Sequence, residues 1–296
     1  MALARDLTES TLPHPGWMHA DMGSGLAGQV RAIMSARSGG ISVPPYAHCN
    51  LGDHVNDNPL VVAHNRHIFE QAIHAKPVWL SQVHGNRLVR LSHEASSDMP
   101  GPDGLWVINP FDDLGRPQAD GALTTEAGLV CAVMVADCLP VLLAAPAGRG
   151  VAALHAGWRG LAGAGDMNGR GIVHTGVQAL CEATGADPAD LHAWLGPCIG
   201  PLQFEVGADV LQGFGVDPAE VDGHARFKPR QLTAGGVSVH GKWLADLPGL
   251  ARDILATQGV RHISGGQWCT VSDASRFFSF RRDGVTGRQA AGICLL

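Results

Sequence analysis

Three apolar, strand-like runs of this chain each end just before a potential soft metal ligand that is followed by glycine or proline. The runs and the segments after them are Val78–Leu80 with Ser81-Gln82-Val83-His84-Gly85, Leu129–Val135 with Ala136-Asp137-Cys138-Leu139-Pro140, and Val151–Leu154 with His155-Ala156-Gly157-Trp158-Arg159-Gly160. A sheet holds its strand ends rigidly and can direct such side chains toward one point. One thiolate and two imidazoles suit a borderline-soft ion such as zinc. The pattern therefore predicts a sheet-based fold with a metal site at His84, Cys138 and His155. Three protein ligands leave a fourth position open, as in catalytic zinc sites.

Spacing along the chain brings only two of these residues together. Cys138 and His155 are 17 residues apart (155 − 138), which is enough for one strand, a turn and a returning strand. If both ends lie at the same sheet edge, the two side chains meet. His84 lies 54 residues before Cys138 (138 − 84), so its spacing does not place it. Because a single buried cysteine is usually just a small hydrophobic residue, the metal prediction depends on the context that all three share.

Composition and charge limit the classes of protein to which the chain can belong. Of its 296 residues, 45% are hydrophobic and 16% are charged, which favours a globular chain with a sizeable core over a disordered one. The net charge of −6 gives no footprint for nucleic acid or for an anionic membrane. The apolar stretch from Gly128 to Ala147 contains Asp137 and Pro140, so two buried strands explain it better than a membrane span does.

Cysteine usage indicates a reducing compartment. The seven cysteines form no Cys-x-x-Cys pair, and residues 1–17 lack the apolar region of a signal peptide. We therefore expect a cytoplasmic protein whose thiols are free, buried or bound to metal.

The periodicity of apolar residues predicts a mixed α+β architecture in one domain. Helices are expected after the N-cap signal Asn58-Pro59, from about Gly171 to Gly185, and from about Asp246 to Gly259. The segment from Val78 to His155 is rich in strands. Residues 1–34 are expected to form an irregular lead-in.

The tail segment from Arg276 to Gly287 places arginines among aromatic residues. Stacked bases and paired phosphates would make it a single-strand nucleic-acid site, but the acidic balance of the chain argues against that. The favoured interpretation is a half-buried strand with Phe278 and Phe280 inward and with Ser279 and Arg281 outward. A small anion site is a third interpretation, because the planar fork of arginine suits phosphate.

Two other interpretations of the metal-ligand residues stay open. In a Cys/His hydrolase, Cys138 would be the nucleophile, with His84 or His155 as its base and Asp137 nearby. In a non-enzymatic protein with a structural zinc, a fourth protein ligand would close the site. Cys198 and His54 are the spare residues that could supply that ligand.

Eight segments resemble motifs of the YfiH family, bacterial proteins long labelled polyphenol oxidase or laccase-domain proteins and now described as purine nucleoside phosphorylases. They run in family order from about residue 35 to the C-terminus, and together they are highly specific. The segments are Arg37-Ser38-Gly39-Gly40-Ile41-Ser42, Asn50-Leu51-Gly52-Asp53-His54-Val55, Gln82-Val83-His84-Gly85, Ala119-Asp120-Gly121-Ala122-Leu123-Thr124-Thr125, Ala136-Asp137-Cys138-Leu139-Pro140, His155-Ala156-Gly157-Trp158-Arg159-Gly160, Leu195-Gly196-Pro197-Cys198-Ile199-Gly200-Pro201 and Phe277-Phe278-Ser279-Phe280-Arg281-Arg282-Asp283-Gly284.

The resemblance implies a fold, a metal and an activity. The fold would be a single α+β domain over residues 35–296, with two packed mixed β-sheets flanked by helices, while residues 1–34 have no counterpart. Zinc would be held by His84, Cys138 and His155. The activity would be phosphorolysis of adenosine, inosine and methylthioadenosine, with adenosine deamination as a side activity. The partners would then be a small-molecule nucleoside and phosphate.

The residues expected to do this chemistry follow from the same motifs. The predicted catalytic set is Cys138, His84, His155 and Asp137. Arg37, Arg159 and Arg281 are the candidates for phosphate binding, because each lies inside a matching segment. The leaving purine's general acid is not assigned.

Two further activities have been associated with the family. The laccase label requires paired His-x-His ligands, and none of the fifteen histidines forms such a pair. Copper is nevertheless a second candidate metal, because it outcompetes zinc at many nitrogen and sulfur sites. The family has also been linked to amide hydrolysis in the editing of peptidoglycan precursors, which a metal-activated water would suit.

Overall fold

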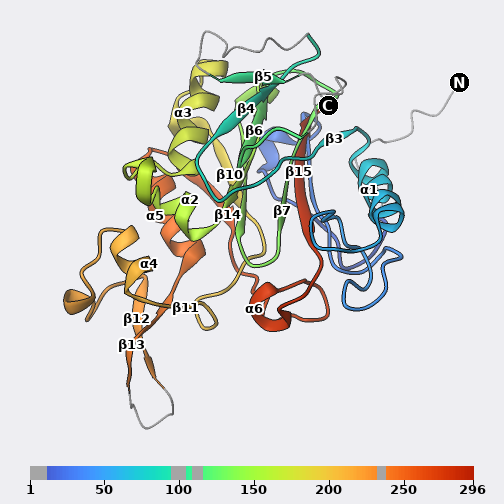
Figure 1. Cartoon of the computed structure of the whole chain (residues 1–296). Coiled ribbons are helices and arrows are strands. Elements are labelled where there is room, and N and C mark those ends of the chain that lie inside the picture. Colours follow the sequence, from blue (N-terminus) through green and yellow to red (C-terminus); the bar gives the residue numbers. More distant parts are fainter. Residues whose placement is uncertain (1–11, 95–104, 109–115, 232–237) are drawn as a thin grey trace, which may run out of the picture.

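Two β-sheets packed face to face form the centre of the molecule, with helices on their outer sides (Figure 1). The computed structural model describes residues 12–94, 105–108, 116–231 and 238–296. The first sheet has the order β1-β2-β15-β7-β3, in which only β3 and β7 are parallel. Its strands are β1 (Met18–His19), β2 (Val30–Met34), β3 (Pro77–Val78), β7 (Val130–Val135) and β15 (Gln289–Leu295).

The second sheet is larger and also mixed. Its order is β14-β10-β8-β9-β6-β4-β5, with an antiparallel centre and parallel pairs at both edges. Its strands are β4 (Leu88–Leu91), β5 (Trp106–Ile108), β6 (Gly121–Thr124), β8 (Leu139–Ala144), β9 (Val151–Ala156), β10 (His192–Leu195) and β14 (His262–Gly265).

A small antiparallel sheet, β11-β13-β12, lies to one side of the large sheets, and its long hairpin extends away from them (Figure 1). Its strands are β11 (Glu205–Val206), β12 (Phe227–Gln231) and β13 (Ser238–Ala245). The α-helices are α1 (Pro59–Ile73), α2 (Trp158–Ala162), α3 (Ile172–Thr184), α4 (Ala208–Gly213), α5 (Leu247–Thr257) and α6 (Phe280–Asp283). Short 3-10 turns are η1 (Ser24–Leu26), η2 (Pro146–Gly148), η3 (Gly165–Met167), η4 (Pro188–Asp190) and η5 (Pro218–Glu220).

Strand β7 shows why these runs are apolar at every position. Its alternate residues Cys131, Val133 and Val135 pack between the two large sheets, whereas Val130, Ala132 and Met134 pack toward α1. Side chains of a strand point to opposite faces in turn, so a strand covered on both faces needs apolar residues throughout. The same logic explains why the Gly128–Ala147 stretch is buried sheet. No helix in the described part of the chain is long and apolar enough to span a bilayer.

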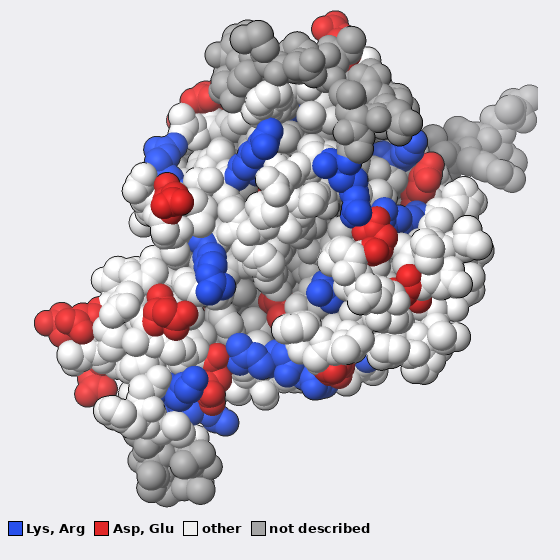
Figure 2. Space-filling model, in the orientation of Figure 1, with Lys and Arg blue, Asp and Glu red and all other residues white. Residues whose placement is uncertain are grey.

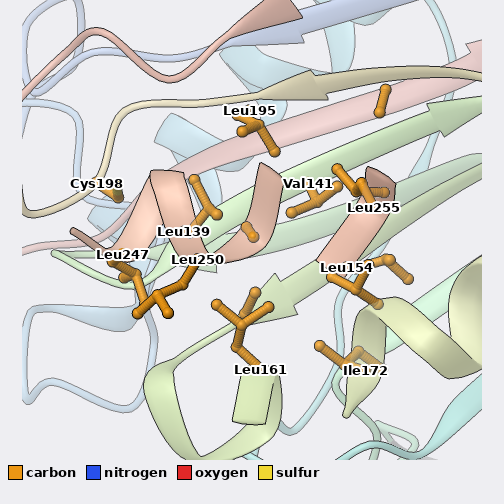
Figure 3. Packing of buried hydrophobic residues seen from close by; sticks show 14 of the residues in the cluster. Leu139, Val141, Leu154, Leu161, Ile172, Leu195, Cys198, Leu247, Leu250 and Leu255 are labelled. Atoms are coloured by element: carbon orange, nitrogen blue, oxygen red, sulfur yellow. The ribbon is translucent and has the colours of Figure 1, made fainter. Parts of the chain in front are cut away.

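The outer face of the second sheet is covered by α2, α3 and α5. Figure 3 shows this cluster, with Leu139 and Val141 of β8 and Leu154 of β9 opposite Leu161, Ile172 and the leucines of α5. A fully buried side chain of this size contributes about 1.5–3 kcal/mol relative to an exposed one. The layer order is therefore helix α1, first sheet, second sheet, and the α2, α3 and α5 helices.

The predicted helices are confirmed, and their ends have local causes. The side chain of Asn58 accepts a hydrogen bond from Leu60 N at the start of α1, and Asp246 accepts one from Gly249 N at the start of α5. Gly185 ends α3 in the left-handed conformation, which glycine adopts without a steric cost. The expected mixed α+β fold with two packed sheets is also confirmed, and the third sheet is an addition that the sequence did not predict.

Two expectations were wrong. The tail is not an alternating strand, because Phe277 and Phe278 are both fully buried and Phe280 is 59% exposed at the start of the one-turn helix α6. Ser279 is buried as the N-cap of that turn and accepts a hydrogen bond from Arg282 N. The lead-in 1–34 is not irregular throughout: it contributes β1 and β2, and residues 1–11 lie outside the described part of the chain.

Candidate metal and substrate site

The chain crosses from the first sheet to the second at two places, and each crossing carries a predicted ligand. His84 lies between β3 and β4, and Cys138 lies between β7 and β8. The third ligand, His155, was expected just after a strand. It lies inside β9 instead, as the fifth residue of that strand. Pro140 pairs with His155 in the β8–β9 ladder, so Cys138 lies close to that histidine. The predicted strand-turn-strand relation is confirmed.

The three side chains lie close enough together to hold one ion. Their ligand atoms are all within 4.8 Å of one another, and Cys138 Sγ lies 3.5 Å from His84 Nε2. The two imidazole rings have centroids 4.7 Å apart and planes inclined at 72°. Tetrahedral zinc, with Zn–S of about 2.3 Å and Zn–N of about 2.0–2.1 Å, would hold such a sulfur and nitrogen about 3.5 Å apart. The residues therefore fit zinc.

Asp120, just before β6, positions two of these ligands. Its fully buried carboxylate accepts a hydrogen bond of 2.8 Å from His155 Nδ1, and further ones from the backbone amides of Val83, His84 and Gly85 at 2.7–3.3 Å. The bond at Nδ1 leaves Nε2 of His155 for the metal, which is the carboxylate–histidine–metal arrangement of many zinc sites. Burial would raise the pKa of Asp120, but the hydrogen bond and charge of His155 and the amides lower it.

Sequence reasoning missed this role of Asp120. The residue lies in a matching segment, but nothing in that segment points to His155 or to the loop around His84. The available signal was a carboxylate inside an otherwise apolar, strand-like run, because a buried charge requires partners.

The electrostatics of the cluster favour a thiolate. Burial would raise the pKa of Cys138, but the charge of His155 and hydrogen bonds from both histidines lower it to about 6. Burial would lower the pKa of His155, but the charge of Cys138 and the hydrogen bond to Asp120 raise it to about 9. Both shifts favour a thiolate beside an imidazolium in the metal-free site. A thiolate serves as a metal ligand or as a nucleophile.

The turn that leads into α2 leaves no room beside the ligands. A Cβ atom added at Gly157 would lie 2.6 Å from His84 Cδ2 and 3.2 Å from Cys138 Sγ. One added at Gly160 would lie 2.7 Å from the carbonyl oxygen of Gly85. The glycines of the His155-Ala156-Gly157-Trp158-Arg159-Gly160 segment thus allow the helix to approach the His84 loop closely.

A cavity of about 670 Å³ opens beside the three ligands, which is within the size range of small-molecule sites. All three ligands and Asp137 line it, and apolar side chains such as Phe204, Leu247 and Phe280 form much of its wall. Figure 2 shows Lys and Arg side chains around a hollow between α2 and α6. The arginines that line the cavity are Arg116, Arg159, Arg281 and Arg288.

Two of the three arginines predicted to bind phosphate line the cavity, and the third does not. Arg159 and Arg281 line the cavity, with their guanidinium groups over the rings of Trp158 at 4.4 Å and Phe204 at 5.6 Å. Arg37 does not line it: its guanidinium donates to the carbonyls of Ala47 and Ala274. Arg37 thus lies apart from the other two, and a phosphate-binding role for each of the three arginines stays a prediction.

Asp137 lines the cavity next to Cys138, but its carboxylate makes hydrogen bonds to two distant segments of the chain. It accepts hydrogen bonds from Thr270 Oγ1 at 2.5 Å and from Arg281 N at 2.7 Å. Its backbone has φ 96°, a conformation that is costly for a residue with a side chain. Asp137 thus ties the β7–β8 crossing to the segment that carries α6, and a catalytic role for it stays a prediction.

The spare ligands do not join the metal site. Within the described ranges, the one group of three or more potential ligands that lie close enough together consists of His84, Cys138 and His155. Cys198 is fully buried, and His54 lines the cavity outside that group. The geometry is therefore that of an open, three-ligand site, which is the pattern of catalytic rather than structural zinc.

The chain matches a known protein family and named relatives. The family described as "Multi-copper polyphenol oxidoreductase laccase" matches residues 31–296. A Shigella flexneri protein named "Purine nucleoside phosphorylase YfiH" is 41% identical over 269 residues, which cover 90% of this chain and 94% of that protein. An Escherichia coli K12 protein of the same name is 40% identical over the same shares.

Solved structures show the same fold. A Neisseria meningitidis protein superimposes with a TM-score of 0.74 at 37% identity, covering 95% of this chain and 99% of that one. A hypothetical protein YfiH from Bacillus licheniformis gives a TM-score of 0.73 at 29% identity, covering 90% and 93%.

Fold and site together define a two-sheet protein with an open His-Cys-His site in a small-molecule cavity. The chain belongs to the YfiH family of laccase-domain proteins, as the resemblance indicated.

Proposed function

We propose that this protein is a zinc-dependent purine nucleoside phosphorylase that acts on adenosine, inosine and methylthioadenosine, with adenosine deamination as a side activity. The observation that carries the proposal is the open three-ligand site in a cavity of nucleoside size that is also lined by arginines. The names of the 40–41% identical relatives support the reaction class. A cytoplasmic location stays a prediction.

Each part of the cavity has a task in this reaction. The apolar wall formed by residues such as Phe204 and Leu247 suits a purine ring and keeps water from it. The arginines suit phosphate, because charge-assisted hydrogen bonds from guanidinium are strong and directional. Asp120 keeps His155 in one orientation and one tautomer. Zinc bound by the three ligands would supply Lewis-acid activation of an oxygen or nitrogen atom.

The proposal is tested with purified, zinc-loaded protein and each of the three nucleosides. With phosphate present, chromatography should show the free base and the pentose 1-phosphate in equal amounts. Without phosphate, adenosine should yield only inosine. Cys138→Ser should lose both zinc and activity, because a neutral hydroxyl is a poor zinc ligand. If the zinc-loaded protein forms no pentose 1-phosphate from any of the three, the proposal is wrong.

A Cys/His hydrolase is the second candidate, because Cys138 Sγ lies 3.5 Å from His84 Nε2, within reach of an activating base. A thiol nucleophile would work without metal, so chelation separates the two functions. Amide hydrolysis of a peptidoglycan-type peptide that persists in the metal-free protein and is abolished by Cys138→Ser would support the hydrolase.

The third candidate, a copper-dependent polyphenol oxidase, has the weakest support. A multicopper centre needs several groups of ligands, and in the part of the chain that the structure describes one such group is found. Oxidation of a phenol by a copper-loaded but not by a zinc-loaded sample would support it.

A further inference from the structure

Arg288 is held at the cavity by a fixed backbone and a confined side chain. It directly precedes β15, its N–H donates to Asn50 Oδ1 at 2.9 Å, and its carbonyl accepts from Leu51 N at 2.9 Å. The absence of a side chain at Gly52 makes room for it, because a Cβ there would lie 2.8 Å from Arg288 Cγ. The side chain is half-buried and lines the same cavity as the three metal ligands.

Arg288 makes no direct ion pair with a carboxylate in the described part of the chain. Its Nη1 donates to the carbonyl oxygens of Thr286 and Gly287 at 3.1 Å. Burial lowers its pKa, whereas the nearby charges of Cys138 and Asp137 raise it. Because an arginine stays protonated and a partly buried guanidinium is costly when no anion pairs with it directly, this side chain is suited to bind an anion.

Among the four arginines that line the cavity, Arg288 is the half-buried one, whereas Arg116, Arg159 and Arg281 are exposed. Arg116 is paired with Asp53 at 2.6 Å, and Arg281 donates to the carbonyl of Glu205 at 3.0 Å. Arg288 Nε and Nη2 make no hydrogen bond within the described structure. Two donors of one planar group match two oxygens of a phosphate.

We propose that Arg288 is the main phosphate-binding residue of this cavity, with Nε and Nη2 donating to two oxygens of an inorganic phosphate next to the His84, Cys138 and His155 site. The inference rests on the proposed phosphorylase function and replaces Arg37, which contacts backbone carbonyls away from the cavity. Arg159 is the second contributor, because its guanidinium lies on Trp158 with no ion pair among the described residues.

The test measures phosphate binding directly on the zinc-loaded protein, by calorimetry with inorganic phosphate and no nucleoside. Arg288→Gln should weaken binding by about tenfold or more, because it removes a charge-assisted pair of hydrogen bonds. Arg288→Lys keeps the charge and should recover part of the affinity. Arg149→Gln is the matched control, since Arg149 also donates to backbone carbonyls but lies outside the cavity, and it should bind phosphate as the unaltered protein does.

Turnover gives a second readout. In Arg288→Gln the KM for phosphate should rise by about tenfold or more, whereas the KM for the nucleoside stays within about twofold. The zinc content and the melting temperature of each variant identify any folding defect. If Arg288→Gln has such a defect, the same measurements on Arg288→Lys decide the test.

Three outcomes have distinct meanings. Unchanged phosphate affinity in Arg288→Gln overturns the inference. Unchanged phosphate affinity with altered zinc content or altered Cys138 reactivity shows instead that Arg288 only compensates the thiolate. Weakened phosphate binding in a protein that releases no base from any nucleoside upholds the phosphate site and rejects phosphorolysis, so the two proposals fail separately.

Discussion

At the scale of single residues, the carboxylate of Asp120 has the widest influence on the site. It fixes His155 through the ring and His84 through the backbone of its loop. Two predicted ligands that are distant in sequence therefore depend on one side chain, which does not belong to the group of three itself. Outer partners of this kind commonly change metal affinity by about 10–100-fold when they are removed.

Replacement of Asp120 by asparagine should weaken zinc binding by about 10–100-fold. Asparagine offers one acceptor oxygen in place of two, so either His155 or the amides around His84 lose a partner. Competition with a chromophoric chelator measures the affinity. Asp187→Asn is the control, because Asp187 also accepts a backbone hydrogen bond but does so as the N-cap of η4, away from the site. Equal zinc affinity in both variants would contradict the assigned role.

The thiol of Cys138 should react with iodoacetamide in the metal-free protein along a pH profile centred near its pKa of about 6. Below that pH the thiol is protonated and slow, and above it the thiolate reacts at a constant rate. Cys49, whose pKa is raised by burial to about 12, should stay unmodified in the folded protein. Mass spectrometry of the labelled peptides measures both. Zinc should protect Cys138, and equal labelling with and without zinc would show that the thiol does not bind it.

Residue identity was the part of the site that sequence could predict best. Cys138 and His155 were found because strand length and turn signals are local properties. The roles of Asp120 and Arg288 could not be found in this way, because each depends on contacts with segments far away in the chain, namely the His84 loop and the Asn50–Gly52 segment.

At the scale of secondary-structure elements, the entry into α2 controls the geometry of the ligands. Gly157 is the N-cap of α2 and lies against both His84 and Cys138. The backbone there has φ −66°, so any amino acid could adopt it, and only the lack of space requires glycine.

Gly157→Ala should therefore displace His84 and lower zinc affinity by about tenfold or more, with little change in the content of helix and strand. The same chelator competition and a far-UV circular dichroism spectrum measure the two effects. Gly25→Ala is the matched control, since a Cβ at Gly25 meets nothing within 4 Å. A Gly157→Ala protein with unaltered zinc binding would show that the His84 loop adapts freely.

Helix ends were predictable from sequence, whereas the tail was not. Caps such as Asn58 and Asp246 act on their own backbone, so the sequence alone reveals them. The tail has the apolar and polar residues of a strand, but Phe277 and Phe278 are buried together by neighbouring segments. An alternating pattern of apolar and polar residues does not form a strand when no neighbouring strand pairs with it, because tertiary packing then decides the conformation.

At the scale of the whole molecule, the candidate metal site lies where the two sheets are connected. Two ligands lie where the chain passes from the first sheet to the second, and the third belongs to the second sheet. Sequence periodicity indicated strands but not their partners. The family resemblance, and not the pattern of residues, supplied the two-sheet arrangement and the approach of His84.

Zinc should raise the melting temperature of the metal-free protein, because an ion that binds only the folded state stabilises it. The gain is about 4 kcal/mol when free zinc is about 1,000 times its dissociation constant. Differential scanning calorimetry measures the shift. Cys138→Ser at the same zinc concentration should show little of it, and an equal shift in that variant would indicate that zinc stabilises the protein elsewhere.

The position of His84 and Cys138 in the crossings between sheets has a practical consequence for redesign. Substitution of these two residues changes no strand residue and no hydrogen bond of a β-ladder. The scaffold can thus serve as a host in which two ligands are varied for softer or harder ions, while His155, oriented by Asp120, supplies a constant ligand.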